Sequence, residues 1–155
     1  MQGLMQDWPL PCNRVIDHAA VQFGHHKVIS RSVEGPIVET TYTEIRARAL
    51  KVAQRLMKEG IKPGDRVGTL AWNTARHLES WYGIMGAGAV YHTVNPRLFP
   101  EQITYIINHA EDRLMLADLT FVPMLEAIAD RLPGIERYII LTDAAHMPKT
   151  TLKNA

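Results

Sequence analysis

The sequence predicts an α/β fold in which consecutive strand–helix units build a parallel sheet with flanking helices, preceded by an N-terminal helix and a β-hairpin. Four compact apolar runs begin near Arg66, Val90, Arg113 and Arg137, which are 24, 23 and 24 residues apart. Amphipathic helical patterns fill the intervals between these runs. Connections of this length suit right-handed βαβ crossovers, and short apolar strands suit a sheet that is covered on both faces.

Composition and charge are those of an ordinary globular domain. The 155 residues fit one domain, and 46% hydrophobic with 21% charged residues is far from the composition of disordered chains. The 17 basic and 16 acidic side chains are interspersed and leave a net charge of +1, which argues against nucleic acid or an anionic membrane surface as a partner. Small molecules or other proteins are the expected partners.

Cysteine content and the lack of a long apolar run indicate a cytoplasmic protein. The single Cys12 excludes an intrachain disulfide and has no metal-ligand spacing. No apolar run approaches the ~20 residues that span a bilayer, and Asp7 stands where a signal peptide has its apolar core. We therefore expect a cytoplasmic chain without membrane contact.

The elements ahead of the sheet are predicted from short local patterns. An amphipathic helix has asparagine at its start and glycine after its end, which are favoured at an N-cap and at a helix stop. Two segments of alternating apolar and polar residues flank a Glu-Gly-Pro turn, which predicts a β-hairpin. The residues concerned are 13–23 for the helix, with Asn13 as N-cap and Gly24 as stop, 27–32 and 37–41 for the strands, and Glu34 to Pro36 for the turn.

A capping box predicts where the next helix begins. Thr41-Tyr42-Thr43-Glu44 has the S/T-x-x-E form, in which the threonine hydroxyl and the glutamate carboxylate each accept the other residue's backbone N–H. An apolar stripe at helical spacing follows, and Gly60 and Pro63 end the helix. The opposite face carries basic side chains that we expect to be solvated: Arg46, Arg48, Lys51 and Lys58.

Three crossover helices and a tail complete the predicted architecture. The tail, residues 143–155, has no periodicity and mixes Thr, Lys, Pro and Asn, which predicts a linker or frayed end after a domain of residues 1–142. The apolar positions of the three helices are Leu78, Trp81, Tyr82, Met85 and Ala89; Ile103, Ile106, Ile107 and Ala110; and Val122, Leu125, Ile128 and Leu132.

Gly83, Gly86 and Gly88 form a G-x-x-G-x-G pattern that superficially suggests a nucleotide-binding loop. They stand at the end of a helix and before a strand, whereas a phosphate-binding loop needs the order strand, glycines, helix N-terminus. We therefore predict that these glycines serve the helix end and the close approach of neighbouring backbones.

The histidines show no H-x-x-x-H pair and no acidic partner at the spacing of metal sites, so we predict no metal site. His92 is expected in a strand and His109 at a helix C-terminus, where its charge is compatible with the helix dipole. Neither supports a nucleophile–base pair, because no Ser or Cys lies in an elbow-like strand-to-helix turn. The seven histidines are His18, His25, His26, His77, His92, His109 and His146.

Two further patterns are interpreted as structural. The aromatic residues lack interleaved basic residues, so they indicate core and interface packing and not base stacking. The segment Met147-Pro148-Lys149-Thr150 lacks the flanking glycines that let a backbone wrap a phosphate, so we interpret it as linker. The aromatic residues are Trp8, Trp72, Trp81, Tyr82, Tyr91 and Tyr105.

Three segments, in this order and spacing, resemble the acyl-CoA synthetase branch of the adenylate-forming superfamily. The third is most similar to the fatty-acid and methylmercaptopropionate-type CoA ligases of bacteria, and the resemblance runs from about residue 15 to residue 142. The segments are Thr41-Tyr42-Thr43-Glu44-Ile45, Gly86-Ala87-Gly88-Ala89-Val90-Tyr91, and His92-Thr93-Val94-Asn95-Pro96-Arg97-Leu98 with Glu101 to Ala110 after it.

The resemblance implies that a carboxylate attacks the α-phosphate of ATP to give an acyl-adenylate and pyrophosphate, after which CoA displaces AMP, with Mg²⁺ neutralising charge. In such ligases the phosphate loop, the magnesium-binding glutamate, the ribose-binding aspartate and the catalytic lysine all come later than the position of Ala155. We therefore expect no catalytic, cofactor-binding or metal residue here, no tight binding of ATP, Mg²⁺ or CoA, and no activity of the isolated chain.

One residue departs from the family pattern. Relatives often place serine or threonine before the proline that opens a helix, whereas Phe99 precedes Pro100 here. The missing cap oxygen should cost about 1 kcal/mol of helix stability unless Phe99 packs in compensation, while Pro100 suits the first helical position.

An alternative function stays open at this point: a free-standing, non-catalytic α/β binding or oligomerisation module, because similar sheets host unrelated functions. If relatives continue the sheet with further strands, the apolar surface left here would be covered by a partner, and we expect a homo-oligomer, a dimer or larger. The family builds its acyl pocket mostly from later residues, so the sequence leaves the identity of the acid open.

Overall fold

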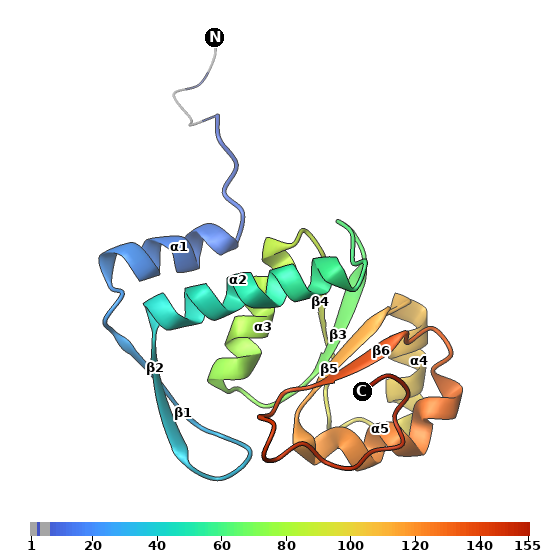
Figure 1. Cartoon of the computed structure of the whole chain (residues 1–155). Coiled ribbons are helices and arrows are strands. Elements are labelled where there is room, and N and C mark those ends of the chain that lie inside the picture. Colours follow the sequence, from blue (N-terminus) through green and yellow to red (C-terminus); the bar gives the residue numbers. More distant parts are fainter. Residues whose placement is uncertain (1–2, 4–6) are drawn as a thin grey trace.

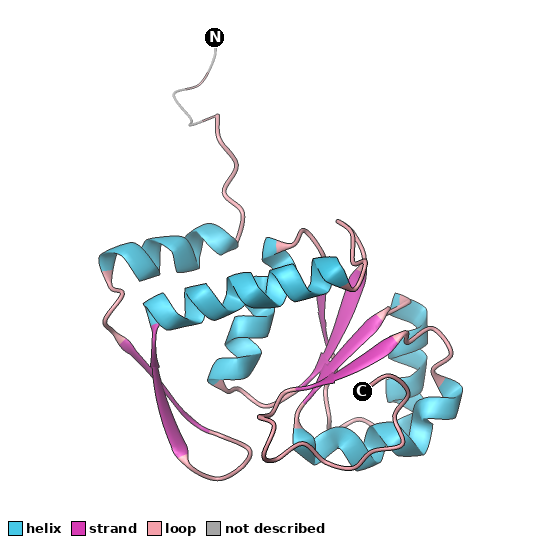
Figure 2. Cartoon of the chain, in the orientation of Figure 1, coloured by secondary structure: helices cyan, strands magenta, loops and turns pink. Residues whose placement is uncertain are grey.

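The computed structural model describes residue 3 and residues 7–155, and Figures 1 and 2 show the arrangement of their helices and strands. Short 3₁₀ turns, Leu119–Phe121 and Ala129–Arg131, flank the last helix. The elements in chain order are α1 (Asn13–Gln22), β1 (Lys27–Arg31), β2 (Ile37–Thr41), α2 (Tyr42–Lys58), β3 (Arg66–Leu70), α3 (Ala75–Gly86), β4 (Val90–Thr93), α4 (Pro100–Ala110), β5 (Leu114–Ala117), α5 (Val122–Ile128) and β6 (Arg137–Ile140).

Four parallel strands form the main sheet in the order β4-β3-β5-β6, which confirms the predicted α/β architecture. Helices α2 and α3 lie on one face of this sheet, and α4 and α5 lie on the other (Figure 1). Strand β5 is buried at all four positions because its side chains alternate between two cores. Leu114 and Leu116 join the core under α2 and α3, whereas Met115 and Ala117 join the core under α4 and α5.

The predicted hairpin is a separate two-stranded antiparallel sheet, with Ile29 opposite Glu39. A third, smaller core lies where α1, α2 and α3 meet, and Ile16, Ile45 and Ala75 are buried in it. The hairpin and α1 thus extend one side of the molecule beyond the main sheet (Figure 2). The elements predicted ahead of the sheet are all present.

The predicted N-cap and last residue of α1 were each wrong by one residue. Cys12, and not Asn13, is the N-cap, and its side chain makes no capping bond. The carbonyl groups of Pro11 and Cys12 accept the N–H groups of Arg14 and Val15, so backbone turns replace a side-chain cap. Phe23 is the C-cap, and Gly24 follows it where a Cβ would clash with the Ala20 carbonyl oxygen of α1.

The capping box of α2 is formed as predicted. The Glu44 N–H donates to Thr41 Oγ1 over 3.3 Å, and the Thr41 N–H donates to Glu44 Oε2 over 2.8 Å. All four basic side chains keep contact with solvent, as expected, but two of them also form ion pairs because α1 and α3 flank α2. Arg46 pairs with Asp17 at 2.7 Å and Arg48 pairs with Glu79 at 2.6 Å, while Lys51 and Lys58 are exposed.

Two of the three glycines at the end of α3 serve packing and turning, as predicted, whereas an added Cβ on Gly86 would meet nothing within 4 Å. A Cβ on Gly83 would lie 2.6 Å from the Val52 side chain and 2.9 Å from the Ala49 carbonyl oxygen, so α2 and α3 approach closely there. Gly88 has φ +77, a left-handed conformation that lets the chain leave the helix and enter β4.

Helix α4 begins without a side-chain cap from Phe99, and Phe99 does not compensate by packing because it is 74% exposed. Gln102 Oε1 instead accepts the Phe99 N–H over 3.1 Å. Pro100 occupies the start of the helix, as predicted.

Residues 143–155 form no helix or strand, yet their second half is tied to α5 and to the core. The Thr150 hydroxyl and the Thr151 N–H both donate to Glu126 Oε1 over 2.7 Å. Leu152 is 5% exposed and belongs to the core under α4 and α5. Across the described part of the chain, no helix combines the length and the apolar character needed to cross a membrane.

Candidate functional site

The carboxyl edge of the sheet, between β3 and β5, is the candidate functional site. The chain moves from β3 to β4 on one side and then crosses to β5 on the other side of β3. In open α/β sheets, ligands bind at such switch points, outside the carboxyl ends of the strands. The segments that follow β3, β5 and β6 meet at this edge, together with the turn of the β1–β2 hairpin.

Asp118 joins the ends of β3 and β5. Its backbone N–H donates to Leu70 O over 3.1 Å, and its Oδ2 accepts the Trp72 N–H over 2.7 Å. Asp118 is 1% exposed, and among the described residues its Oδ1 has no partner. Burial raises the pKa of the Asp118 carboxyl, although the Trp72 N–H and the Arg76 charge oppose this.

The indole of Trp72 packs over the same edge. Its Nε1 donates to Thr120 Oγ1 over 3.3 Å, and its ring lies 5.1 Å from that of Phe121, centroid to centroid. On the other side of the sheet, Trp81 makes edge-on contacts with Tyr82 and Tyr91. Both tryptophans thus make aromatic packing contacts, and Trp72 is also 43% exposed.

Arg76 of α3 ties the hairpin turn to the segment after β6. Its Nη1 donates to Glu34 Oε1 over 2.6 Å and to Leu141 O over 3.1 Å. The Thr142 hydroxyl donates to the same Glu34 oxygen over 2.6 Å. Burial alone would raise the pKa of Glu34, but these hydrogen bonds outweigh it and lower the pKa to about 2, so Glu34 carries a negative charge.

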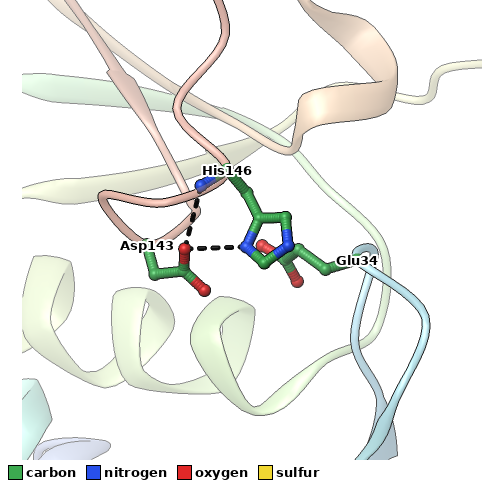
Figure 3. Close-up of side chains that lie close together, drawn as sticks. All are labelled: Glu34, Asp143 and His146. Atoms are coloured by element: carbon green, nitrogen blue, oxygen red, sulfur yellow. Dashed lines mark hydrogen bonds and ion pairs between the residues drawn. The ribbon is translucent and has the colours of Figure 1, made fainter.

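His146 and Asp143 lie beside Glu34 at the end of this network (Figure 3). The distance from His146 Nδ1 to Asp143 Oδ1 is 2.8 Å. A second histidine–carboxylate pair joins His92 Nδ1 to the buried Asp112 Oδ2 over 2.7 Å, at the opposite end of the sheet. Neither pair was predicted from the sequence: Asp143 lies only three residues before His146 in the same loop, whereas the His92–Asp112 pair is made by a tertiary contact.

A wide groove lies next to this site, beside the edge strand β4. It has a volume of about 880 Å³. His77 lies in it and contacts three groups: its Nδ1 is 3.1 Å from Trp72 O, and its Nε2 meets the hydroxyls of Thr69 and Tyr91. Since a carbonyl oxygen only accepts, Nδ1 carries the proton, and Nε2 accepts from Tyr91. Burial lowers the pKa of His77, which keeps its imidazole neutral.

The polar groups at this edge mainly bind one another. Within the described residues no Ser or Cys side chain is hydrogen-bonded to a histidine. The segment Met147 to Thr150, which has a phosphate-loop-like Pro-Lys pair, forms no helix or strand and is tied to Glu126 at Thr150. The absence of catalytic and cofactor-binding residues from the chain stays a prediction.

Comparison with known proteins identifies the family. A family model described as "AMP-binding enzyme" matches residues 16–155. The 3-methylmercaptopropionyl-CoA ligase of Ruegeria lacuscaerulensis is 46% identical over 141 residues, and the medium-chain-fatty-acid–CoA ligase of Ectopseudomonas oleovorans is 43% identical over 141 residues. Each match covers 91% of this chain and 26% of the relative, so the chain spans about a quarter of the length of these relatives.

Solved structures share the fold. The anthranilate CoA ligase AuaEII in complex with anthranoyl-AMP is 25% identical with a TM-score of 0.74, and the match covers 88% of this chain and 26% of that one. The N-terminal domain of FACL13 from Mycobacterium tuberculosis is 23% identical with a TM-score of 0.73, and the match covers 91% of this chain and 38% of that one. The α/β fold of residues 7–155 is thus that of the N-terminal domain of acyl-CoA synthetases, and the chain belongs to the AMP-binding acid:CoA ligase family as a partial, N-terminal portion.

Proposed function

We propose that this chain is the N-terminal part of an acid:CoA ligase for a fatty or related aliphatic acid. The whole enzyme would convert ATP, a carboxylic acid and CoA into acyl-CoA, AMP and pyrophosphate, with Mg²⁺ as the metal ion. The observation that carries this proposal is the agreement among relatives. Four of them, 40 to 47% identical over 141 residues, are CoA ligases for methylmercaptopropionate, medium-chain or long-chain fatty acids.

Within such an enzyme, this chain supplies scaffold and not reacting groups. Supporting this, the charged groups at the carboxyl edge of the sheet are held by one another, as Arg76 is by Glu34. The neutral His77 is held by Trp72 and Tyr91. Side chains that are hydrogen-bonded to one another in this way hold loops in position. Catalysis of adenylation instead needs hydrogen-bond donors and cationic side chains that are available to bind a phosphate. The isolated chain is therefore inactive and does not bind ATP, Mg²⁺ or CoA tightly.

An AMP-release assay with two proteins tests the proposal. The chain alone, given ATP, Mg²⁺, CoA and aliphatic acids of several lengths, should release no AMP above the blank. A chimera that joins residues 1–155 to the remaining part of the Ruegeria lacuscaerulensis ligase should release AMP with aliphatic acids. AMP from the chain alone would refute the scaffold role. A folded chimera without activity would favour the alternative of a free-standing binding module.

We further propose that the chain works as a homodimer in the cytoplasm. Strand β4 is an edge of the sheet, and its Val90 side chain is 48% exposed, which suits coverage by a second copy. Light scattering at micromolar concentration should give twice the 17.5 kDa mass of one chain. A monomer mass would contradict the dimer, and cell fractionation tests the compartment.

A further inference from the structure

Three potential metal ligands from two distant segments meet at one place (Figure 3). Glu34 lies in the turn between β1 and β2, and Asp143 and His146 lie in the loop after β6. Each residue offers one ligand atom, and these atoms all lie within 4.8 Å of one another. A metal ion at their centre would need only small side-chain movements to reach all three.

Glu34 is the buried member of this cluster, and half of its carboxylate is unused. The side chain is 3% exposed. Its Oε1 accepts from Arg76 and Thr142, whereas Oε2 is buried without a hydrogen-bond partner among the described residues. Burying a carboxylate oxygen without a partner is costly, so this oxygen favours any cation that reaches it.

Asp143 and His146 provide the open side of the cluster. Their side chains are 50% and 52% exposed, which gives an ion a path from solvent. Asp143 Oδ1 accepts the N–H groups of Ala145 and His146, each over 3.0 Å, so the loop holds the carboxylate in place. Asp143 Oδ2 lies 3.8 Å from Arg76 Nη2, a longer contact than those made by Oδ1, so Oδ2 is the more available of the two oxygens for an ion.

The nature and charge of the ligands select the kind of ion. One imidazole nitrogen with two carboxylate oxygens suits Zn²⁺ and other divalent transition metals better than Mg²⁺ or Ca²⁺, which prefer all-oxygen sites. The two carboxylates carry two negative charges and the Arg76 guanidinium one positive charge, so the cluster keeps a net negative charge that attracts a divalent cation. Binding of the ion to His146 Nδ1 would displace any proton on that nitrogen, while Asp143 Oδ1 keeps its two backbone N–H donors.

We propose that Glu34, Asp143 and His146 form a binding site for a divalent transition-metal ion of the Zn²⁺ class. Because its ligands come from the hairpin turn and from the loop after β6, the ion fastens the hairpin to the sheet. This site is separate from the Mg²⁺ of the proposed ligase reaction, and it does not depend on the proposed function.

Calorimetric titration with ZnCl₂ tests the site in the metal-free, tag-free chain. The Cys12→Ser background removes the one exposed thiol, which is a competing zinc ligand. We expect one Zn²⁺ per chain, and we expect His146→Ala and Asp143→Asn each to weaken binding by about tenfold or more. The matched control is His25→Ala with His26→Ala, which removes two neighbouring imidazoles away from the site and should leave binding unchanged.

Co²⁺ absorption and thermal melting keep the test independent of folding. Co²⁺ should give a visible absorption spectrum in the Cys12→Ser chain that is lost in His146→Ala, whose melting temperature in EDTA should equal that of the parent. Zn²⁺ should raise the melting temperature of the parent and not that of His146→Ala. Equal binding by parent and His146→Ala, or loss of binding in the His25/His26 control, would overturn the proposal.

Discussion

The contact between α2 and α3 at Gly83 gives the sharpest prediction about stability. A Cβ at this position would lie 2.6 Å from Val52 Cβ and Cγ1 and 2.9 Å from the Ala49 carbonyl oxygen. Real Cβ atoms do not approach other atoms so closely, so Gly83→Ala must push α3 away from α2. Two opposing effects then decide the sign of the change in stability.

Alanine in place of a helical glycine stabilises by up to about 1 kcal/mol. Overpacking a close contact costs about 1 to 3 kcal/mol. At Gly83 the overpacking cost exceeds the gain from replacing a helical glycine, because Val52 is β-branched and stiff and the Ala49 oxygen belongs to the backbone of α2, so neither can move aside easily. We expect Gly83→Ala to lower the free energy of unfolding by about 1 to 2 kcal/mol, and the melting temperature by about 3 to 6 °C.

Gly86→Ala is the matched control, since it lies at the end of the same helix and its added Cβ would meet nothing within 4 Å. It should leave stability unchanged or raise it by about 0.5 kcal/mol. Urea unfolding of both variants, followed by circular dichroism, gives the comparison. Combining Gly83→Ala with Val52→Ala should cost less than the sum of the single changes. If Gly83→Ala were as stable as Gly86→Ala, the close approach of the two helices would be refuted.

The other predictions concern a cap, a buried charge and the tail. Phe99→Ser should raise the free energy of unfolding by about 1 kcal/mol, because a cap oxygen is gained and the 74% exposed ring contributes little packing; Phe99→Ala, which adds no oxygen, should not. Because the pKa of Glu34 is lowered from its ordinary value of 4.5 to about 2, its charged form stabilises the fold fully above pH 4.5, and this contribution is lost as the pH falls toward 2. In EDTA, Glu34→Gln should therefore flatten the dependence of stability on pH across that range. If urea unfolding gave the same dependence of stability on pH for the parent and for Glu34→Gln, this prediction would be contradicted. Leu152→Ala should cost about 2 to 3 kcal/mol because Leu152 is buried in the core, whereas exposed Lys153→Ala should cost nothing measurable; equal melting temperatures would show that the tail is detached.

The strands and capped helices were predictable because local chemistry decides them. Thr41 and Glu44 lie within one helical turn, so the capping box needs no distant partner. The compact apolar runs at β3 and β5 predicted strands that are buried on both faces of the sheet, and nearly all their residues are buried. Where a backbone turn could replace a side-chain cap, as at Cys12, residue preference placed the boundary of α1 one residue too late.

The features that the sequence did not reveal depend on distant contacts. Arg48 pairs with Glu79 only because α3 packs against α2, and a solvated face has the same pattern. Glu34 meets His146 because the hairpin turn folds against the loop after β6, and no spacing rule connects such segments. The order β4-β3-β5-β6 places these loops at one edge, and periodicity alone does not set strand order.

The position of β3 between β4 and β5 has a consequence for the order of folding. Strand β4 pairs with β3 across a single intervening helix, whereas β5 must wait until β4 and α4 have also been traversed. Longer loops cost more entropy to close, so β1–β2 and β3–β4 can pair early and β3–β5 pairing comes late. Until that late pairing, one side of β3 is an open strand edge. A growing or refolding chain is therefore most prone to associate with others in the interval before β5 joins the sheet.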